Sequence, residues 1–369
     1  MDQRIGKKYF ISVLLLFLLW NCSERGLREE EWVLGPFEKL DEVNPVLEPV
    51  NNTWFLCPLR GDSVQWEVKD VFNPAAVVKD GKIFLLYRAE DSVGRYAGTS
   101  RIGLAMSDDG LHFKRNDQPV LFPSHDGWDQ YEWEGGVEDP RVVEDEIGNY
   151  WMTYTTYDGD KARLCVATSS DLIHWTKYGS VFEKAKNQNW KNEWSKSGAI
   201  ITQMRGDKQV AVRVKDKYWM YFGDTHLYLA SSENFIDWTP VVDSQGKWKQ
   251  VLSPRVGKFD SELVEPGPPA LLTEKGILLI YNSRNDAEHG DPQLERGSYA
   301  AGQVMFSLED PSKEILRKEN NFFKPDKPYE ITGQVNNVCF LEGMVFFQDR
   351  WLIYYGTADS KIAVAESLP

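Results

Sequence analysis

The segment WEGGVEDPRVV (133–143) combines residues capable of acid–base chemistry with an apolar run typical of a buried strand. A carboxyl group held where such a strand begins is partly desolvated, and desolvation raises its pKa. A carboxyl that keeps its proton near neutral pH can act as a general acid on a glycosidic oxygen. We therefore predict that Asp139 is a general acid, with Glu134 and Glu138 as supporting neighbours.

Arg141 follows Asp139 by two residues, so on a regular strand both side chains would face the same side. From that position Arg141 could bind a substrate phosphate or a sugar hydroxyl. A structural ion pair with Glu138 or Glu134 is equally compatible with the spacing.

An internal repeat indicates what positions these residues. An apolar or aromatic strand with a polar tail recurs at 83–91, 150–158, 218–224, 277–286 and 351–359. A second strand follows most copies, and another apolar run precedes each of them. Regular repetition of short strands, with almost no helical periodicity, predicts an all-β fold: a five-bladed β-propeller with one unit per blade. A large β-sandwich would not explain why the same strand pair recurs with the same ending.

The candidate site lies at the starts of the apolar runs that precede the repeated strands. They are polar, and each leads into an apolar run, at 73–74, 138–141, 195–198, 265–267 and 336–337. The innermost strands of a propeller line one axis, so we expect Asn73, Asp139 and Glu265 around a single pocket. The acids at the ends of the second strands recur from unit to unit, so Asp108, Asp109 and Asp171 are predicted to be turn residues.

The motif GGVEDPRV (135–142) resembles the signature of glycoside hydrolase family 130, the mannoside phosphorylases and mannosidases. The resemblance runs over about 70–360 and includes NPAA (73–76), YRAED (87–91), SRIGLAMSDDGLHF (100–113) and EPGPPALLTEKGILLIYN (265–282). It implies a five-bladed propeller in which Asp139 donates the proton through the mannosyl 3-hydroxyl, with attack from the opposite face and inversion. Asn73 stands where related five-bladed families carry an Asp that serves as base or nucleophile.

Because the family contains both phosphorylases and mannosidases, the resemblance leaves two reactions to distinguish, phosphorolysis and hydrolysis. It implies that phosphorylases hold phosphate with the Arg of the EDPR motif, a Lys of the third blade and a His-Arg pair. This chain keeps Arg141 and Lys196, but its residues at the place of the pair are Phe222, Gly223 and Asp224. Losing two cations and gaining an anion weakens binding of a dianion, which favours hydrolysis.

An inverting hydrolase needs a base across a gap wide enough for water. Asp224 and Glu265 are the candidates for that base, with Glu262 and Glu193 in reserve, and Asp224 could instead be a simple turn residue. The remaining predicted substrate contacts lie at strand ends: Arg88, Asp91, Arg101, Tyr157, Asp158 and Asp359. Asp158 and Asp359 could equally cap blade turns. The segment EHGDPQLER (288–296) breaks the repeat and is a candidate rim loop.

The N-terminus predicts export. Basic residues precede the apolar run FISVLLLFLLW (10–20), and Cys22 follows it directly. This pattern is typical of a bacterial lipoprotein signal over 1–22, with Cys22 lipidated, and an ordinary cleaved signal also predicts export. We therefore expect a tether and lead-in over 23–60, a catalytic propeller over 61–369, and a location in the periplasm or at the outer-membrane surface.

Composition limits the partners. A net charge of −14 argues against nucleic acid and against an anionic membrane surface, so membrane attachment is expected only through the lipid. Beyond Cys22 the chain has three cysteines, an odd number that argues against a disulfide framework. Its five histidines are scattered, so neither a metal nor another cofactor is expected.

Three hypotheses remain for the function, and all of them take a mannose-containing oligosaccharide as the partner. The first is an exported inverting β-mannosidase, with β-1,2-linked mannosides as the best guess. The second is a β-mannoside phosphorylase. The third is a non-catalytic propeller that binds glycan for an uptake system. The intact EDPR motif (138–141) weighs against the third.

Overall fold

The computed structural model describes residues 28–96, 98–185 and 190–367. The predicted signal over 1–22, with Cys22, lies outside these residues. Within them the only α-helices are single turns, α1 (Asp129–Glu132) and α2 (Pro328–Ile331), beside short 3-10 turns at Glu29–Glu31 and Trp190–Asn192. The predicted all-β class is therefore confirmed.

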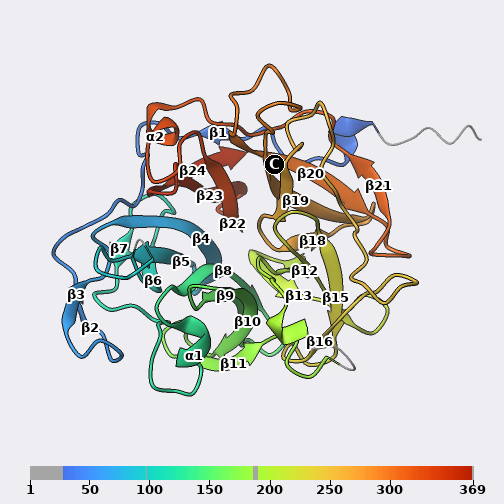
Figure 1. Ribbon diagram of the computed structural model, residues 1–369. Helices are drawn as coiled ribbons and strands as arrows, with labels where there is room; N and C mark the ends of the chain where they lie inside the picture. The colour runs from blue at the N-terminus through green and yellow to red at the C-terminus, as the bar shows by residue number, and fades with distance from the viewer. Residues whose placement is uncertain (1–27, 97, 186–189, 368–369) are drawn as a thin grey trace, which may run out of the picture.

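Most of the strands form antiparallel groups arranged around a common centre (Figure 1). The first comprises β4 (Asp70–Lys79), β5 (Lys82–Glu90), β6 (Ser100–Ser107) and β7 (Lys114–Arg115). The second comprises β8 (Gly136–Glu144), β9 (Tyr150–Tyr157), β10 (Ala162–Ser169) and β11 (Thr176–Ser180). The third comprises β12 (Ala199–Arg205), β13 (Lys208–Ala211), β14 (Tyr218–Phe222), β15 (Tyr228–Ser232) and β16 (Trp238–Pro240).

The fourth group comprises β17 (Leu263–Pro266), β18 (Ala270–Leu272), β19 (Ile277–Arg284), β20 (Tyr299–Phe306) and β21 (Glu314–Arg317). The last comprises β22 (Cys339–Phe347), β23 (Arg350–Thr357), β24 (Lys361–Ser367) and β1 (Glu38–Lys39), and a separate hairpin pairs β2 (Trp54–Leu56) with β3 (Ser63–Gln65). The groups follow the predicted repeat units, and each begins with the apolar run expected to lie innermost.

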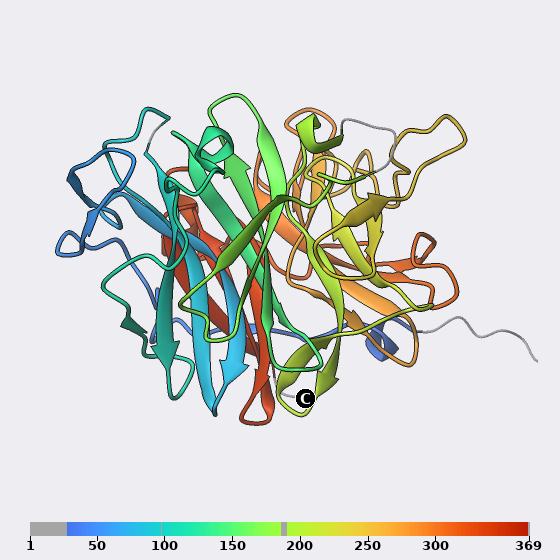
Figure 2. The same cartoon turned by 90° about the horizontal axis from the view of Figure 1, so that it is seen from below.

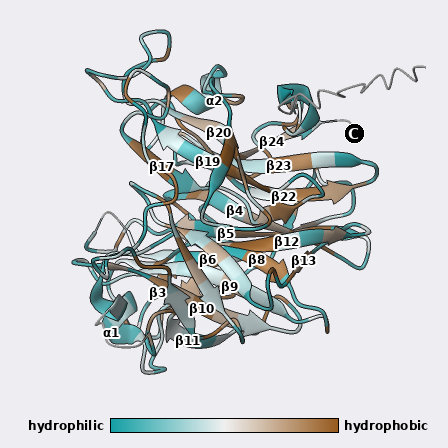
Figure 3. Ribbon diagram, turned by 90° about the vertical axis from the view of Figure 1, so that its right-hand side faces the viewer, coloured by the Kyte–Doolittle hydropathy of each residue, from teal (hydrophilic) through white to brown (hydrophobic). Residues whose placement is uncertain are grey.

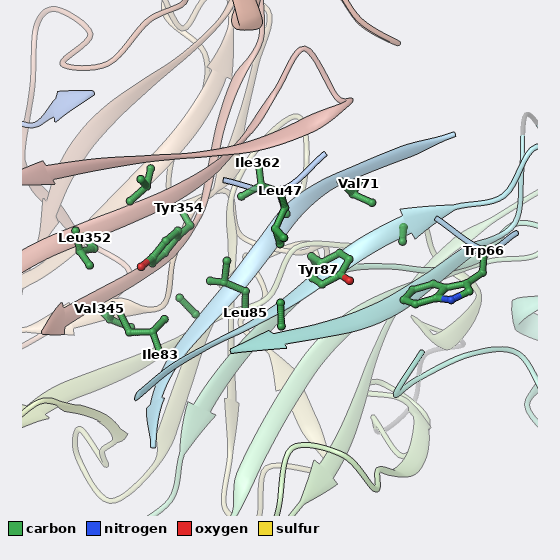
Figure 4. Close-up of a cluster of buried hydrophobic side chains, with 14 of the residues drawn as sticks. Leu47, Trp66, Val71, Ile83, Leu85, Tyr87, Val345, Leu352, Tyr354 and Ile362 are labelled. Atoms are coloured by element: carbon green, nitrogen blue, oxygen red, sulfur yellow. The ribbon is translucent and has the colours of Figure 1, made fainter. Parts of the chain in front are cut away.

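The core lies between neighbouring groups. Figure 4 shows one such layer, where Ile83 and Leu85 of β5 lie beside Val345 and Tyr354 of the last group. Strands such as β8 and β22 consist largely of apolar residues, while the loops are mostly hydrophilic (Figure 3). Each group therefore buries a face against the next, as the alternation of short apolar strands requires.

The N-terminal segment joins the last group. Glu38 and Lys39 of β1 pair with Glu366 and Ala365 of β24, so the last sheet contains strands from both ends of the chain. The pairing covers the edge of β24, which would otherwise leave its backbone groups open to water. The first and last groups lie side by side, with β4 packed against β22 and β23 (Figure 2).

The turn prediction is confirmed for two of the acids. The Asp109 carboxylate accepts hydrogen bonds from the backbone N–H groups of Leu111 and His112, and Asp171 does the same one group later, so both are turn residues. The cysteines of the described ranges, Cys57, Cys165 and Cys339, are buried and free, so they form no disulfide framework there.

Candidate active site

Asp139 lies near the centre, where the starts of several inner strands meet. Its side chain is 3% exposed. Its Oδ1 accepts a hydrogen bond of 3.0 Å from Asn73 Nδ2 and lies 3.4 Å from Arg88 Nη1. Its Oδ2 lies 3.6 Å from Lys196 Nζ. Groups from the first and third units thus converge on one carboxylate of the second.

Local backbone bends aim these side chains at the centre. Asn73, Asp139 and Ser197 have φ angles of 46°, 49° and 58°, in the left-handed region that Asn and Asp tolerate best among residues with a side chain. The register of β4 shifts between Phe72 and Pro74, and that of β8 shifts between Glu138 and Arg141. A bulge of this kind redirects one side chain out of the regular alternation.

Lys196 lies between the acid and the first candidate base. Its Nζ is 3.6 Å from Asp139 Oδ2 and 3.4 Å from Glu265 Oε1, so these two oxygens are at most about 7 Å apart. Glu265 is 4% exposed and accepts a hydrogen bond from the Ser197 hydroxyl. The structure therefore brings Asn73, Asp139, Lys196 and Glu265 together, as expected from their places in the repeat.

Asp224 belongs to the same charge cluster. Its Oδ2 accepts a hydrogen bond of 2.8 Å from Trp194 Nε1. Burial, together with the Asp224 charge, raises the pKa of Glu265 despite the opposing charge of Lys196. The negative charge of Asp224 thus contributes to the raised pKa of both Glu265 and Lys196.

Arg88 is held by several acids at once. Its guanidinium lies 2.7 Å from Glu90, 3.1 Å from Glu138 and 3.4 Å from Asp139. Its Nε donates a hydrogen bond of 3.0 Å to the Ser100 hydroxyl. Arg88 therefore fixes the EDPR segment, and Glu90 is a contributor that sequence reasoning missed.

The predicted orientation of Arg141 is wrong. The bulge in β8 breaks the regular alternation of its side chains between the two faces of the sheet. The Arg141 side chain therefore lies buried between strands and is 2% exposed. Its Nη2 donates to Pro266 O at 2.6 Å and its Nε to Gly267 O at 2.8 Å. Its Nη1 lies 3.0 Å from Glu342 Oε1, so its ion-pair partner is neither Glu138 nor Glu134.

Glu342 is a further charged residue that sequence reasoning missed. It is fully buried in β22, and the register of that strand shifts between Leu341 and Gly343. Burial raises its pKa strongly, against the charge of Arg141. The signal was present as a lone acid inside the apolar run CFLEGMVFF (339–347).

The electrostatics of Asp139 differ from the expectation. Burial opposes its ionisation, but the charges of Arg88 and Lys196 and the hydrogen bond from Asn73 outweigh burial and lower its pKa. The predicted upward shift is therefore wrong for the free site. Burial and the Asp139 charge instead raise the pKa of the adjacent Glu138, although Arg88 opposes this.

The outer predicted contacts have structural partners. Arg101 is fully buried and pairs with Asp91 at 2.7 Å, and Asp91 also accepts hydrogen bonds from backbone N–H groups of its own loop. Asp158 caps a turn at Asp160 and pairs with Arg163 at 2.6 Å. These contacts hold Asp91, Arg101 and Asp158 in the loops around the site.

Tyr157, Glu262 and Glu193 are not among the direct partners of the Asp139 carboxylate, which are Asn73, Arg88 and Lys196. The Tyr157 ring packs against the Tyr96 ring with 5.9 Å between centroids. Glu262 pairs with Arg284 at 2.6 Å, which weakens its case as a reserve base. Glu193 is exposed.

The raised pKa of Asp359 should make the stability of the fold depend on pH. Burial, reinforced by the nearby charges of Asp139 and Glu90, raises its pKa to about 7 against the attraction of Arg88 and Lys196. The folded protein therefore binds this proton more tightly than the unfolded chain between about pH 4 and about pH 7. The stability contribution of Asp359 is complete below that window and is lost as the pH rises through it.

We expect Asp359→Asn to flatten this dependence, because the amide cannot ionise. Unfolding free energies from urea titrations across about pH 4 to about pH 7 should fall less steeply for the variant than for the wild type. Equal slopes for the two proteins would show that Asp359 keeps an ordinary pKa.

Two further observations concern the described residues alone. No group of three or more His, Cys, Asp or Glu side chains there has an arrangement that could hold a metal ion. None of the helices in the same ranges has the length and apolar character needed to cross a bilayer.

Comparison with known proteins finds similar chains over most of the sequence. A family model described as glycoside hydrolase family 130, beta-1,4-mannooligosaccharide phosphorylase, matches residues 41–368. A 1,2-beta-oligomannan phosphorylase from Thermoanaerobacter is 32% identical over 310 residues, which is 82% of this chain and 90% of that protein. A beta-1,2-mannobiose phosphorylase from the same organism is 29% identical over 86% of this chain and 96% of its own length.

Solved structures are similar at higher identity. A glycosyl hydrolase from Bacteroides ovatus is 47% identical, with a TM-score of 0.89 over 92% of this chain and 95% of that chain. Another structure is 46% identical, with a TM-score of 0.90 over 93% of this chain and 96% of that chain. It comes from work stating that this family of mannoside phosphorylases contains glycoside hydrolases that target β-1,2-mannosidic linkages in Candida mannan.

Proposed function

Because the chain belongs to glycoside hydrolase family 130, whose members act on β-mannosides, we propose that it is an inverting hydrolase of β-1,2-linked mannosides. Asp139 is the general acid in this proposal. Asp224 and Glu265 are the candidates for the base that activates water. Asn73, Arg88, Lys196 and Asp359 surround the sugar that is cleaved.

The cations at the site are already paired with protein groups, and this observation favours hydrolysis over phosphorolysis. Among the described residues at the site, Lys196 lies between Asp139 and Glu265, and Arg88 is shared by Glu90, Glu138 and Asp139. Arg141 is committed to backbone carbonyls and Glu342. A phosphate dianion would have to displace carboxylates from each of these cations, whereas water does not.

The separation of acid and base limits how the proposed inversion can work. Oxygens of Asp139 and Glu265 are at most about 7 Å apart, at the short end of the roughly 6.5–9.5 Å that leaves room for water, so with Glu265 as base Lys196 must lie almost in line between the two carboxylates. A bound sugar excludes water from Asp139, which raises its pKa toward the working range. Glu138, the adjacent carboxyl with a raised pKa, shares Arg88 with Asp139 and supports it.

Product analysis tests the proposal. We expect β-1,2-mannobiose to yield mannose at the same rate with and without inorganic phosphate. Formation of mannose 1-phosphate that requires phosphate would support the alternative, a β-mannoside phosphorylase, which the similarity to curated phosphorylases and the presence of Lys196 favour. Binding of oligomannoside without turnover of any mannoside would support the third possibility, a non-catalytic glycan-binding protein.

The same proposal includes the fold and the cellular location. We take the successive antiparallel groups as the five blades of a propeller over 61–369. We take 1–22 as a lipoprotein signal with Cys22 as the lipidated residue, so that the enzyme works in the periplasm or at the outer-membrane surface beside glycan-uptake proteins. Export favours hydrolysis, because a sugar phosphate made outside the cytoplasm would be lost. Recovery of the protein in the cytosol of its natural host would contradict export.

A further inference from the structure

A second hollow lies beside Asp224 on the third group. It has a volume of about 460 Å³ and is lined by three aromatic side chains and several polar residues: Trp190, Glu193, Tyr228, Gly246, Lys247, Trp248 and Gln250. The aromatic residues are half-buried, and Glu193, Lys247 and Gln250 are exposed. None of these residues contacts Asp139 in the cluster described above.

Several observations place this hollow next to the candidate base. Tyr228 begins β15 and pairs with Phe222, the last residue of β14, two positions before Asp224. A Cβ on Gly223 would lie 3.1 Å from Tyr228 Cδ2. Burial and the charge of Asp224 both raise the pKa of Tyr228, whereas a hydrogen bond with Gln250 lowers it. Trp194, which donates to Asp224, belongs to the same loop as Trp190.

The aromatic rings are fixed before any ligand arrives. The Trp248 ring packs 5.1 Å from Phe222, 5.4 Å from Phe182 and 5.4 Å from Tyr228, measured between centroids. Trp190 packs edge-on to Trp248 at 6.4 Å. Packing on the core side therefore holds the rings, while their other sides line the hollow. A rigid aromatic wall binds at low entropic cost.

The lining matches the chemistry of a neutral sugar. A pyranose offers an apolar C–H face to an aromatic ring and hydroxyl groups to polar side chains. Glu193 and Gln250 supply carboxylate and amide groups for paired hydroxyl contacts, and Lys247 supplies an ammonium donor. A volume of about 460 Å³ is in the range of small-ligand pockets.

We propose that this hollow is a distal subsite that binds a mannosyl unit of the oligosaccharide beyond the two units joined by the cleaved bond. The proposal rests on the function proposed above, since it takes the mannoside chain as the ligand. It predicts that the enzyme discriminates by chain length through the third group. A disaccharide is too short to use the subsite, whereas a longer chain spans it.

The test compares chain lengths in matched variants. For Trp190→Ala, the ratio of kcat/KM on β-1,2-mannotetraose to kcat/KM on β-1,2-mannobiose should fall about tenfold relative to the wild type. Gln250→Ala, at an exposed position that does not support the core, should lower the same ratio by about threefold, because it removes a neutral hydrogen bond. The control is Trp54→Ala, a Trp 56% exposed on the β2–β3 hairpin, whose ratio should not change.

The outcomes separate this proposal from the proposed function. An unchanged ratio in both Trp190→Ala and Gln250→Ala would overturn the subsite. If the wild type cleaved neither mannoside, the hydrolase proposal would fail first. Calorimetric titration of Asp139→Asn with mannotetraose would then decide the subsite: binding weakened about tenfold by adding Trp190→Ala would support it, and unaltered binding would overturn it.

Discussion

Asp139→Asn should lower kcat on β-1,2-mannobiose by about 10²–10⁴-fold, the usual contribution of a positioned general acid. The amide has nearly the same shape as the carboxyl and can still contact Asn73, Arg88 and the surrounding strands. It cannot deliver a proton to the glycosidic oxygen. Steady-state rates, with the thermal midpoint measured alongside, check this expectation.

A matched variant separates catalysis from a general effect of losing a carboxylate. Asp171→Asn removes an acid that organises an exposed turn through backbone contacts, so it should leave kcat within about twofold while lowering stability slightly. If Asp139→Asn retained more than about a tenth of the wild-type kcat with an unchanged fold, Asp139 would not be the acid.

Arg141→Met should destabilise the fold by about 3–5 kcal/mol, the cost of breaking a buried ion pair by removing one partner. Glu342 would be left in the core either with an uncompensated charge or protonated at a cost. The carbonyl oxygens of Pro266 and Gly267 would lose their donor as well. Because Arg141 ties the strand carrying Asp139 to the strand carrying Glu265, activity should fall with stability. Urea-unfolding free energies measure the first effect.

An exposed arginine provides the comparison for Arg141→Met. Arg205 is 49% exposed and pairs at 3.0 Å with Glu146, which is 60% exposed, so Arg205→Met should cost no more than about 1 kcal/mol. Arg141→Lys is the informative conservative change, since one ammonium cannot reach carbonyls and carboxylate together as the guanidinium fork does. Near-wild-type stability of both Arg141 variants would show that Arg141 is not structural.

Local pattern was enough to predict the all-β class, the repeated strand units and the turn acids. These depend on periods of a few residues, which the sequence displays directly. The same pattern predicted that Asn73, Asp139 and Glu265 meet, because each stands at the start of an equivalent inner strand. The resemblance added the family, which the match over residues 41–368 confirms.

The tertiary structure decided the environment of each charge. A bulge in β8 turned Arg141 away from its expected side, and only the packing of β22 brought Glu342 to it. The sequence was enough to predict that Asp139, Lys196 and Glu265 reach the centre of this protein, but it did not reveal Glu90 and Glu342. Their pKa values and partners depend on distances between groups that are far apart in the chain, and a one-dimensional pattern does not contain those distances.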